Sequence, residues 1–204
     1  MRYNDYVPYF NIRERSVAVI GLGYVGLTLS LVLADNGFSV SGYDTDKALV
    51  DKLRNKKTPF YENGLENLLL THVGTNFCPI GTIDSLDADV YIVTVGTPII
   101  PGIMKPNIEH ICKAVAVIAD RLKKNDMVIL RSTVPVGCTR TEVIPLLEKV
   151  SGLRAGEDFH IAFCPERTAE GRALKELREL PQIIGGIDQQ SRELAMRLFN
   201  ENTH

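Results

Sequence analysis

The sequence lacks the marks of a membrane or nucleic-acid-binding protein. Its 204 residues contain no apolar run approaching the roughly 18 residues that a membrane span needs. Lysine and arginine together number 23 against 25 acidic residues and never cluster, so no basic surface for nucleic acid is evident. Residues 1–15 show no continuous apolar stretch of the kind found in secretory signals. We therefore expect a cytoplasmic protein with no membrane and no nucleic-acid partner.

Cysteine and histidine are too few and too scattered to form a metal site. The cysteines stand far apart, with no CxxC pair, at Cys78, Cys112, Cys138 and Cys164. His72, His110 and His160 have no partners at metal-ligand spacing, and we expect them on the surface or at helix ends. Cys164 has no nearby histidine to activate it, so we expect it to fill space in the core.

What the sequence does contain is an alternation of short β-branched runs with helical stretches from Ser16 onward. Candidate strands cover residues 16–20, 39–43, 90–95, 127–130, 159–163 and 182–185. Candidate helices cover residues 23–36, 46–54, 64–71, 108–123, 140–150 and 189–200. This alternation predicts an α/β, doubly wound Rossmann fold with a mainly parallel six-stranded sheet. The domain would occupy residues 16–204, after an N-terminal arm of residues 1–15, and bind its ligand at the carboxyl ends of the strands.

The segment from Gly21 to Gly26 has the GxGxxG spacing of dinucleotide-binding loops and joins an apolar strand to a helix. Gly21 permits a tight turn, Gly23 lets a pyrophosphate approach the backbone, and Gly26 lets the helix pack closely. About 20 residues later a second strand ends at Asp44, whose carboxylate suits the adenosine ribose and repels a 2′-phosphate. The sequence therefore predicts NAD as the cofactor, the alternative being a glycine-rich turn in a protein that binds no nucleotide.

Three further polar segments follow candidate strands at the same edge of the sheet. Thr97, after Gly96, offers a hydroxyl to the pyrophosphate or ribose, and Thr133 could contact the nicotinamide end or order a water. Ordinary structural loops are an equal alternative for both. The segment from Cys164 to Gly171 places two carboxylates and an arginine where substrate should meet the nicotinamide, and the alternative there is a solvated charged loop.

Together these motifs resemble the nucleotide-sugar 6-dehydrogenases, the family of UDP-glucose and GDP-mannose dehydrogenases. The matching segments follow the family's order, at residues 21–27, 44, 59–65, 95–98, 132–137 and 164–171. The Cys-Pro-Glu-Arg form of the last segment resembles the branch acting on UDP-N-acetylhexosamines, such as UDP-N-acetylmannosamine dehydrogenase. Members oxidise a sugar CH2OH to a carboxylate in two NAD-dependent steps, so the resemblance implies a UDP-sugar substrate.

The resemblance also implies roles for individual residues. Cofactor contacts are implied at Tyr24, Val25, Asp44, Thr97 and Thr133. Substrate contacts are implied at Arg167 and Thr168, with Glu166 and Glu170 in the catalytic cleft. Glu166 and Thr133 would help to position the water or proton used in hydrolysis and hydride transfer.

One departure from the family concerns its catalytic cysteine and lysine, which lie well downstream in segments that this sequence does not match. We expect the amino-terminal part of a larger enzyme, inactive alone, without the central helix and the UDP-sugar-binding domain. The whole protein is expected to form a homodimer or a higher homo-oligomer. Two alternatives are a simpler dehydrogenase of the 3-hydroxyacyl or 6-phosphogluconate type, which the segment 164–171 disfavours, and a non-catalytic dinucleotide-binding regulatory module.

Overall fold

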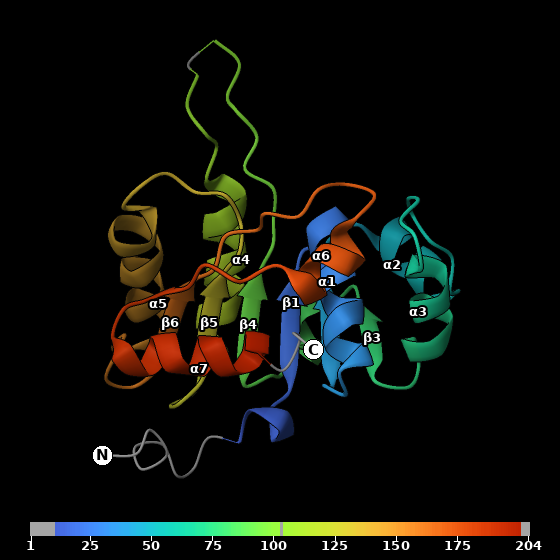
Figure 1. Cartoon of the computed structure of the whole chain (residues 1–204). Helices are drawn as coiled ribbons and strands as arrows, with labels where there is room; N and C mark the ends of the chain where they lie inside the picture. The colour runs from blue at the N-terminus through green and yellow to red at the C-terminus, as the bar shows by residue number, and fades with distance from the viewer. Residues whose placement is uncertain (1–10, 103, 201–204) are drawn as a thin grey trace.

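The computed structural model describes residues 11–102 and 104–200, and these residues form one seven-stranded sheet with helices on both faces (Figure 1). The strand order is β3-β2-β1-β4-β5-β6-β7, and every neighbouring pair is parallel except β6 with β7. The strands are β1 (Val17–Ile20), β2 (Val40–Tyr43), β3 (Phe77–Ile80), β4 (Val90–Val93), β5 (Met127–Leu130), β6 (His160–Phe163) and β7 (Gly185–Gly186).

Alternate side chains of the strands pack on opposite faces and create two cores. Val17 and Val19 of β1 face a core that includes α1, α3, α6 and α7, whereas Ala18 and Ile20 face one that includes α4 and α5. The helices are α1 (Tyr24–Asp35), α2 (Lys47–Arg54), α3 (Leu65–His72), α4 (Glu109–Ala119), α5 (Ile144–Ser151), α6 (Ala173–Glu179) and α7 (Gln189–Asn200).

The connections out of the two central strands lead to opposite faces of the sheet. The chain leaves β1 through α1 toward β2, and it leaves β4 through α4 toward β5, although β1 and β4 are neighbours. This arrangement opens a crevice at the carboxyl ends of β1 and β4, which is where doubly wound sheets bind ligands.

The predicted fold class is confirmed, but the sheet has seven strands where the sequence predicted six. The missed strand is β3, in which Pro79 interrupts the apolar pattern. Because β3 lies at the edge of the sheet, a proline can be accommodated there. The strand expected at 182–185 is reduced to β7, and the short charged helix α6 was not expected. A π-helical turn, Thr139–Val143, precedes α5 within the helix expected at 140–150.

Further expectations concerned the N-terminal arm, the histidines and membrane spans. Most of the expected N-terminal arm lies outside the described residues, but Ile12 is buried and its 3-10 turn packs against α7. Of the histidines expected at the surface or at helix ends, His72 does end a helix, although it is buried, whereas His160 is buried in β6. His72 ends α3, where its ring contacts the side chains of Asp35 and Asn76 at 3.2 and 2.8 Å. No helix in the described part of the chain is long and apolar enough to cross a membrane.

The carboxyl of Asp126 predicts a pH-dependent stability. Asp126 is 1% exposed at the amino edge of the sheet, and burial raises its pKa from 3.8 to about 6. Because the folded pKa exceeds the unfolded one, ionisation destabilises the fold, with no cost below pH 3.8 and the full cost above pH 6. Asp126→Asn cannot ionise, yet it keeps an oxygen that can accept from the Lys123 N–H.

We therefore expect D126N to raise the free energy of unfolding by on the order of 2 kcal/mol at neutral pH. Near pH 4 the gain should almost vanish. Urea denaturation at both pH values measures the difference, and an equal gain at both would show that ionisation of Asp126 is not its cause.

Candidate active site

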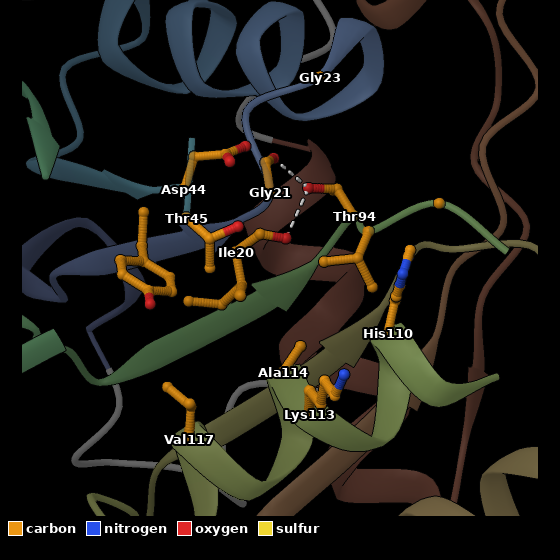
Figure 2. A pocket seen from close by; sticks show the side chains of 13 residues that line it. Ile20, Gly21, Gly23, Asp44, Thr45, Thr94, His110, Lys113, Ala114 and Val117 are labelled. Atoms are coloured by element: carbon orange, nitrogen blue, oxygen red, sulfur yellow. Dashed lines mark hydrogen bonds between the residues drawn. The ribbon is translucent and has the colours of Figure 1, made fainter. Parts of the chain in front are cut away.

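A pocket of about 400 Å³ opens at the crevice between β1 and β4 (Figure 2). It lies between the loops that follow β1, β2 and β4 and one side of α4. Its lining comprises Ile20, Gly21, Gly23, Tyr43, Asp44, Thr45, Thr94, Val95, Gly96, His110, Lys113, Ala114 and Val117. Among the predicted cofactor residues it includes Gly21, Gly23 and Asp44, whereas Tyr24, Val25, Gly26, Thr97 and Thr133 lie outside this lining.

The glycine loop is shaped by three different requirements. Gly21 has a φ of +98°, which favours glycine, and its N–H donates to the Tyr43 carbonyl. A Cβ on Gly26 would lie 1.8 Å from the Gly21 carbonyl oxygen and 2.6 Å from Thr94 Oγ1. A Cβ on Gly23 would meet nothing within 4 Å, so the backbone at the start of α1 faces open space. The close packing predicted for Gly26 is thus against the loop carbonyl and Thr94.

Thr94, which the sequence analysis did not single out, holds the glycine loop in place. Its hydroxyl donates to the carbonyls of Ile20 and Gly21 at 3.0 and 2.7 Å, as the dashed lines in Figure 2 show. The residue directly follows β4, so the end of one central strand fixes the turn that follows the other.

Asp44 follows β2 and directs its carboxylate toward the glycine loop. Oδ2 accepts from the Leu22 N–H at 2.7 Å, and Oδ1 accepts from the Asp46 N–H at 2.9 Å. Each carboxylate oxygen has two lone pairs, so both retain capacity to accept from ligand hydroxyls. Asp44 can therefore hold the loop and bind a ribose at the same time.

The opposite wall of the pocket comes from α4 and was not predicted. Ala114 and Val117 present apolar surface, together with Ile20 of β1, to the space below the glycine loop (Figure 2). His110 and Lys113 line the same side, and Lys113 forms an ion pair with Glu109 at 2.7 Å. A flat, partly apolar ring such as a purine suits this wall.

The loops after β4 and β5 contact one another beside the pocket. The Thr97 hydroxyl donates to the Thr133 carbonyl at 2.7 Å, and the Ser132 hydroxyl donates to the Val95 carbonyl at the same distance. The structure thus brings together Thr97 and Thr133, which the sequence placed at one site. The side chain of Ser132 is buried, whereas Thr133 is exposed.

A buried ion pair anchors the segment that follows β6. Arg131, at the end of β5, is 1% exposed, and its Nε and Nη2 lie 2.7 and 2.6 Å from Glu166 Oε2. Nη1 donates to Gln182 Oε1 at 3.1 Å, and the guanidinium stacks over the Phe199 ring at 5.0 Å. This role of Arg131 was not predicted from the sequence. A signal was available, since a charged residue that ends the apolar run Met-Val-Ile-Leu needs a buried partner.

Both oxygens of Glu166 are engaged. Besides the Arg131 contacts of Oε2, Oε1 accepts from the backbone N–H groups of Arg167 and Thr168, each at 2.7 Å. Burial acts to raise the pKa of Glu166, but the Arg131 guanidinium and these hydrogen bonds outweigh it and lower the pKa below its ordinary value. Glu166 is therefore an ionised carboxylate that shapes the segment 166–171.

The other predicted substrate-side residues flank this carboxylate. Arg167 is exposed and donates to the Pro181 carbonyl, Thr168 is half-buried, and Glu170 is exposed. The Tyr24 hydroxyl of α1 also reaches this segment, since it donates to Glu62 and accepts from the Gly171 N–H at 2.8 Å. Burial and the Glu62 carboxylate raise the pKa of Tyr24 to about 12.

Cys164 fills space in the core, as expected. It is fully buried, and burial raises the pKa of its thiol to about 12, so it carries no thiolate near neutral pH. None of the four cysteines, all of which lie in the described part of the chain, is among the residues that line the pocket.

Comparison with known proteins agrees with this geometry. The model of the NAD-binding domain of the UDP-glucose/GDP-mannose dehydrogenase family matches residues 15–203. A UDP-N-acetyl-D-mannosamine dehydrogenase from Campylobacter jejuni is 38% identical over 189 residues, covering 90% of this chain and 46% of its own. The chain thus spans about half the length of the curated relatives that it matches.

Solved structures give the same result. A UDP-D-ManNAc dehydrogenase from Pyrococcus horikoshii superposes with a TM-score of 0.88 and 30% identity, over 92% of this chain and 45% of that one. A ternary complex of GDP-mannose dehydrogenase from Pseudomonas aeruginosa superposes with a TM-score of 0.86 and 31% identity, over 91% and 44%.

Proposed function

Because the chain belongs to the UDP-glucose/GDP-mannose dehydrogenase family and carries its NAD-binding domain, we propose that it is the cofactor half of a UDP-sugar 6-dehydrogenase. The substrate proposed for the whole enzyme is a UDP-N-acetylhexosamine, whose C6 alcohol is oxidised to a carboxylate. Relatives named UDP-N-acetyl-D-mannosamine dehydrogenase support this choice. The observation that carries the proposal is the convergence of Gly21, Gly23 and Asp44 on one pocket.

The residues of the pocket fit a dinucleotide. The open backbone at Gly23 and the first turn of α1 receive the pyrophosphate, where free N–H groups and the helix dipole stabilise negative charge. Asp44 accepts from the ribose hydroxyls, and the wall formed by Ala114 and Val117 receives the adenine. NAD, when bound, would supply the hydride acceptor for the sugar C6, and conversion of the CH2OH to a carboxylate takes one water and removes two hydrides and three protons.

The residues beside the pocket are proposed to serve the nicotinamide and the sugar. Thr133, whose carbonyl accepts from the Thr97 hydroxyl, is proposed to orient a water, and the exposed Glu170 is proposed to take up a proton. Arg167 and Thr168 supply the contacts to the diphosphate of the substrate. Glu166 serves catalysis as an ionised carboxylate that holds this segment in its shape.

Asp44→Ala tests the assignment of the cofactor. We expect NAD affinity to fall by about 10- to 100-fold, because hydrogen bonds from the ribose to a carboxylate are lost. Preference for NAD over NADP should vanish with the charge. Calorimetric titration with both dinucleotides measures this.

Asp46→Ala is the matched control for Asp44→Ala. It removes an exposed carboxylate two residues away that caps α2 by accepting from the Ala48 and Leu49 N–H groups. This control should cost about 1 kcal/mol of stability and leave NAD affinity unchanged. Retained discrimination against NADP in D44A would rule out the proposed role of Asp44.

The chain alone is expected to bind NAD without oxidising a nucleotide sugar. The resemblance implies that oxidation needs a reactive catalytic cysteine. In this chain Cys164 is buried and protonated, and none of the other cysteines lines the pocket. The assay incubates the 204-residue chain with NAD and UDP-N-acetylmannosamine and follows NADH absorbance. Formation of NADH by this chain alone would refute the assignment of a cofactor half.

A further inference from the structure

A buried carboxylate joins three segments that are far apart in the sequence. Glu62 is 5% exposed, although it lies in the loop before α3. Its Oε2 accepts from the Tyr24 hydroxyl and, at 2.9 Å, from the Gly171 N–H. The Tyr24 oxygen in turn lies 2.8 Å from the Gly171 nitrogen, so the three groups form a closed triangle.

The surroundings of this triangle keep its members in place. The Phe60 ring packs against the Tyr24 ring with centroids 4.9 Å apart. On the other side, the Arg172 N–H donates to the Ala169 carbonyl, and the Ala169 N–H donates to Glu176 of α6 at 2.8 Å. The residues on either side of Gly171 are therefore also held by hydrogen bonds.

The segment 166–171 is consequently fixed at both ends by charged groups. Arg131 holds Glu166 at its start, and Glu62 holds Gly171 at its end. Of these two contacts, the one made by Glu62 also involves α1, because Tyr24, whose hydroxyl donates to Glu62, is the first residue of that helix. The backbone of Tyr24 lies where the pyrophosphate is proposed to bind, while its hydroxyl contacts the segment proposed to bind the sugar nucleotide.

We propose that Glu62 is a positioning residue which, through Tyr24, couples dinucleotide binding at the start of α1 to the geometry of the segment 166–171. This inference rests on the proposed function, because it requires NAD at that helix turn. It gives a role to the segment 59–65, which the sequence singled out without assigning it one.

Hydrogen–deuterium exchange of the whole chain, with and without NAD, tests the coupling. In the parent protein, NAD should slow exchange in the peptide containing residues 166–172 by about tenfold. Tyr24→Phe keeps the ring contact with Phe60 but loses the hydroxyl, so NAD should no longer slow exchange there. Glu62→Ala should have the same effect, and Glu62→Gln should restore part of it because its amide oxygen still accepts.

Glu66→Gln, an exposed neighbour in α3, serves as the control and should behave like the parent. Calorimetry and thermal melts accompany each variant, so that exchange is compared between folded proteins that are saturated with NAD. Undiminished NAD-dependent protection in Y24F and E62A would overturn the inference. The inference would also be overturned if the parent protein binds NAD but exchange in residues 166–172 does not change. If the parent protein binds no NAD, the proposed function is refuted. In that case, faster exchange of this peptide in NAD-free E62A than in the parent would still support the contact between Glu62 and Gly171.

Discussion

Gly26→Ala is expected to weaken NAD binding severely and to destabilise the fold, whereas Gly23→Ala should weaken NAD binding and leave the fold intact. At position 26 the new methyl would lie 1.8 Å from the Gly21 carbonyl oxygen, so α1 must move away from the loop. We expect a loss of about 2–3 kcal/mol in the free energy of unfolding and an NAD affinity at least ~100-fold lower.

Gly23→Ala provides the contrast, because its methyl would meet no protein atom within 4 Å. The φ of −63° at this position suits alanine, and the weaker helix cap costs less than about 1 kcal/mol. The methyl would, however, occupy the space into which the pyrophosphate must come, so NAD affinity should fall at least ~10-fold. Urea denaturation and calorimetric titration measure the two effects. NAD binding by G23A at parental affinity would place the pyrophosphate elsewhere.

Arg131→Met is expected to be among the most destabilising substitutions in the chain. It leaves Glu166, 11% exposed, as a buried carboxylate without its cation, which typically costs about 3–5 kcal/mol. The double variant R131M/E166Q removes the charge but keeps an oxygen that can accept from the Arg167 and Thr168 N–H groups. It should therefore recover most of the loss.

The pH dependence of this loss identifies its origin. In the parent, the lowered pKa of Glu166 gives a stabilisation that is complete above its ordinary pKa of 4.5 and disappears as the pH falls through the folded pKa. In R131M burial is opposed only by the hydrogen bonds from the Arg167 and Thr168 N–H groups, so the pKa of Glu166 is higher than in the parent. The difference in unfolding free energy between R131M and the parent should therefore be largest at neutral pH and shrink toward pH 4. A difference independent of pH would point to packing against Phe199 instead.

The parts of the site that the sequence predicted are those set by short-range constraints. Gly21 and Gly23 lie in the turn after β1, Gly26 lies in the first turn of α1, and Asp44 follows the strand paired with β1, so spacing alone indicates that they are neighbours. The same reasoning correctly placed Thr97 and Thr133 together, because carboxyl ends of neighbouring parallel strands meet at one edge.

The parts that the sequence did not reveal depend on contacts between distant segments. Nothing local indicates that His110 and Lys113 of α4 line the pocket, because that depends on how the helix packs on the sheet. The same holds for Glu62, whose partner Gly171 lies 109 residues further along the chain. Strand β3 was missed for a local reason, since its proline suits only an edge strand.

The most direct test of NAD binding at the β1–β4 crevice is a titration of the 15N-labelled chain with NAD, followed by its amide chemical shifts. If NAD binds as proposed, the largest changes fall at residues 21–26, 44–45 and 94–96, and they saturate below about 1 mM. Amides on the outer side of α5, away from the crevice, should stay unchanged. Absence of saturable changes at the glycine loop, or changes centred on another surface, would contradict the assignment.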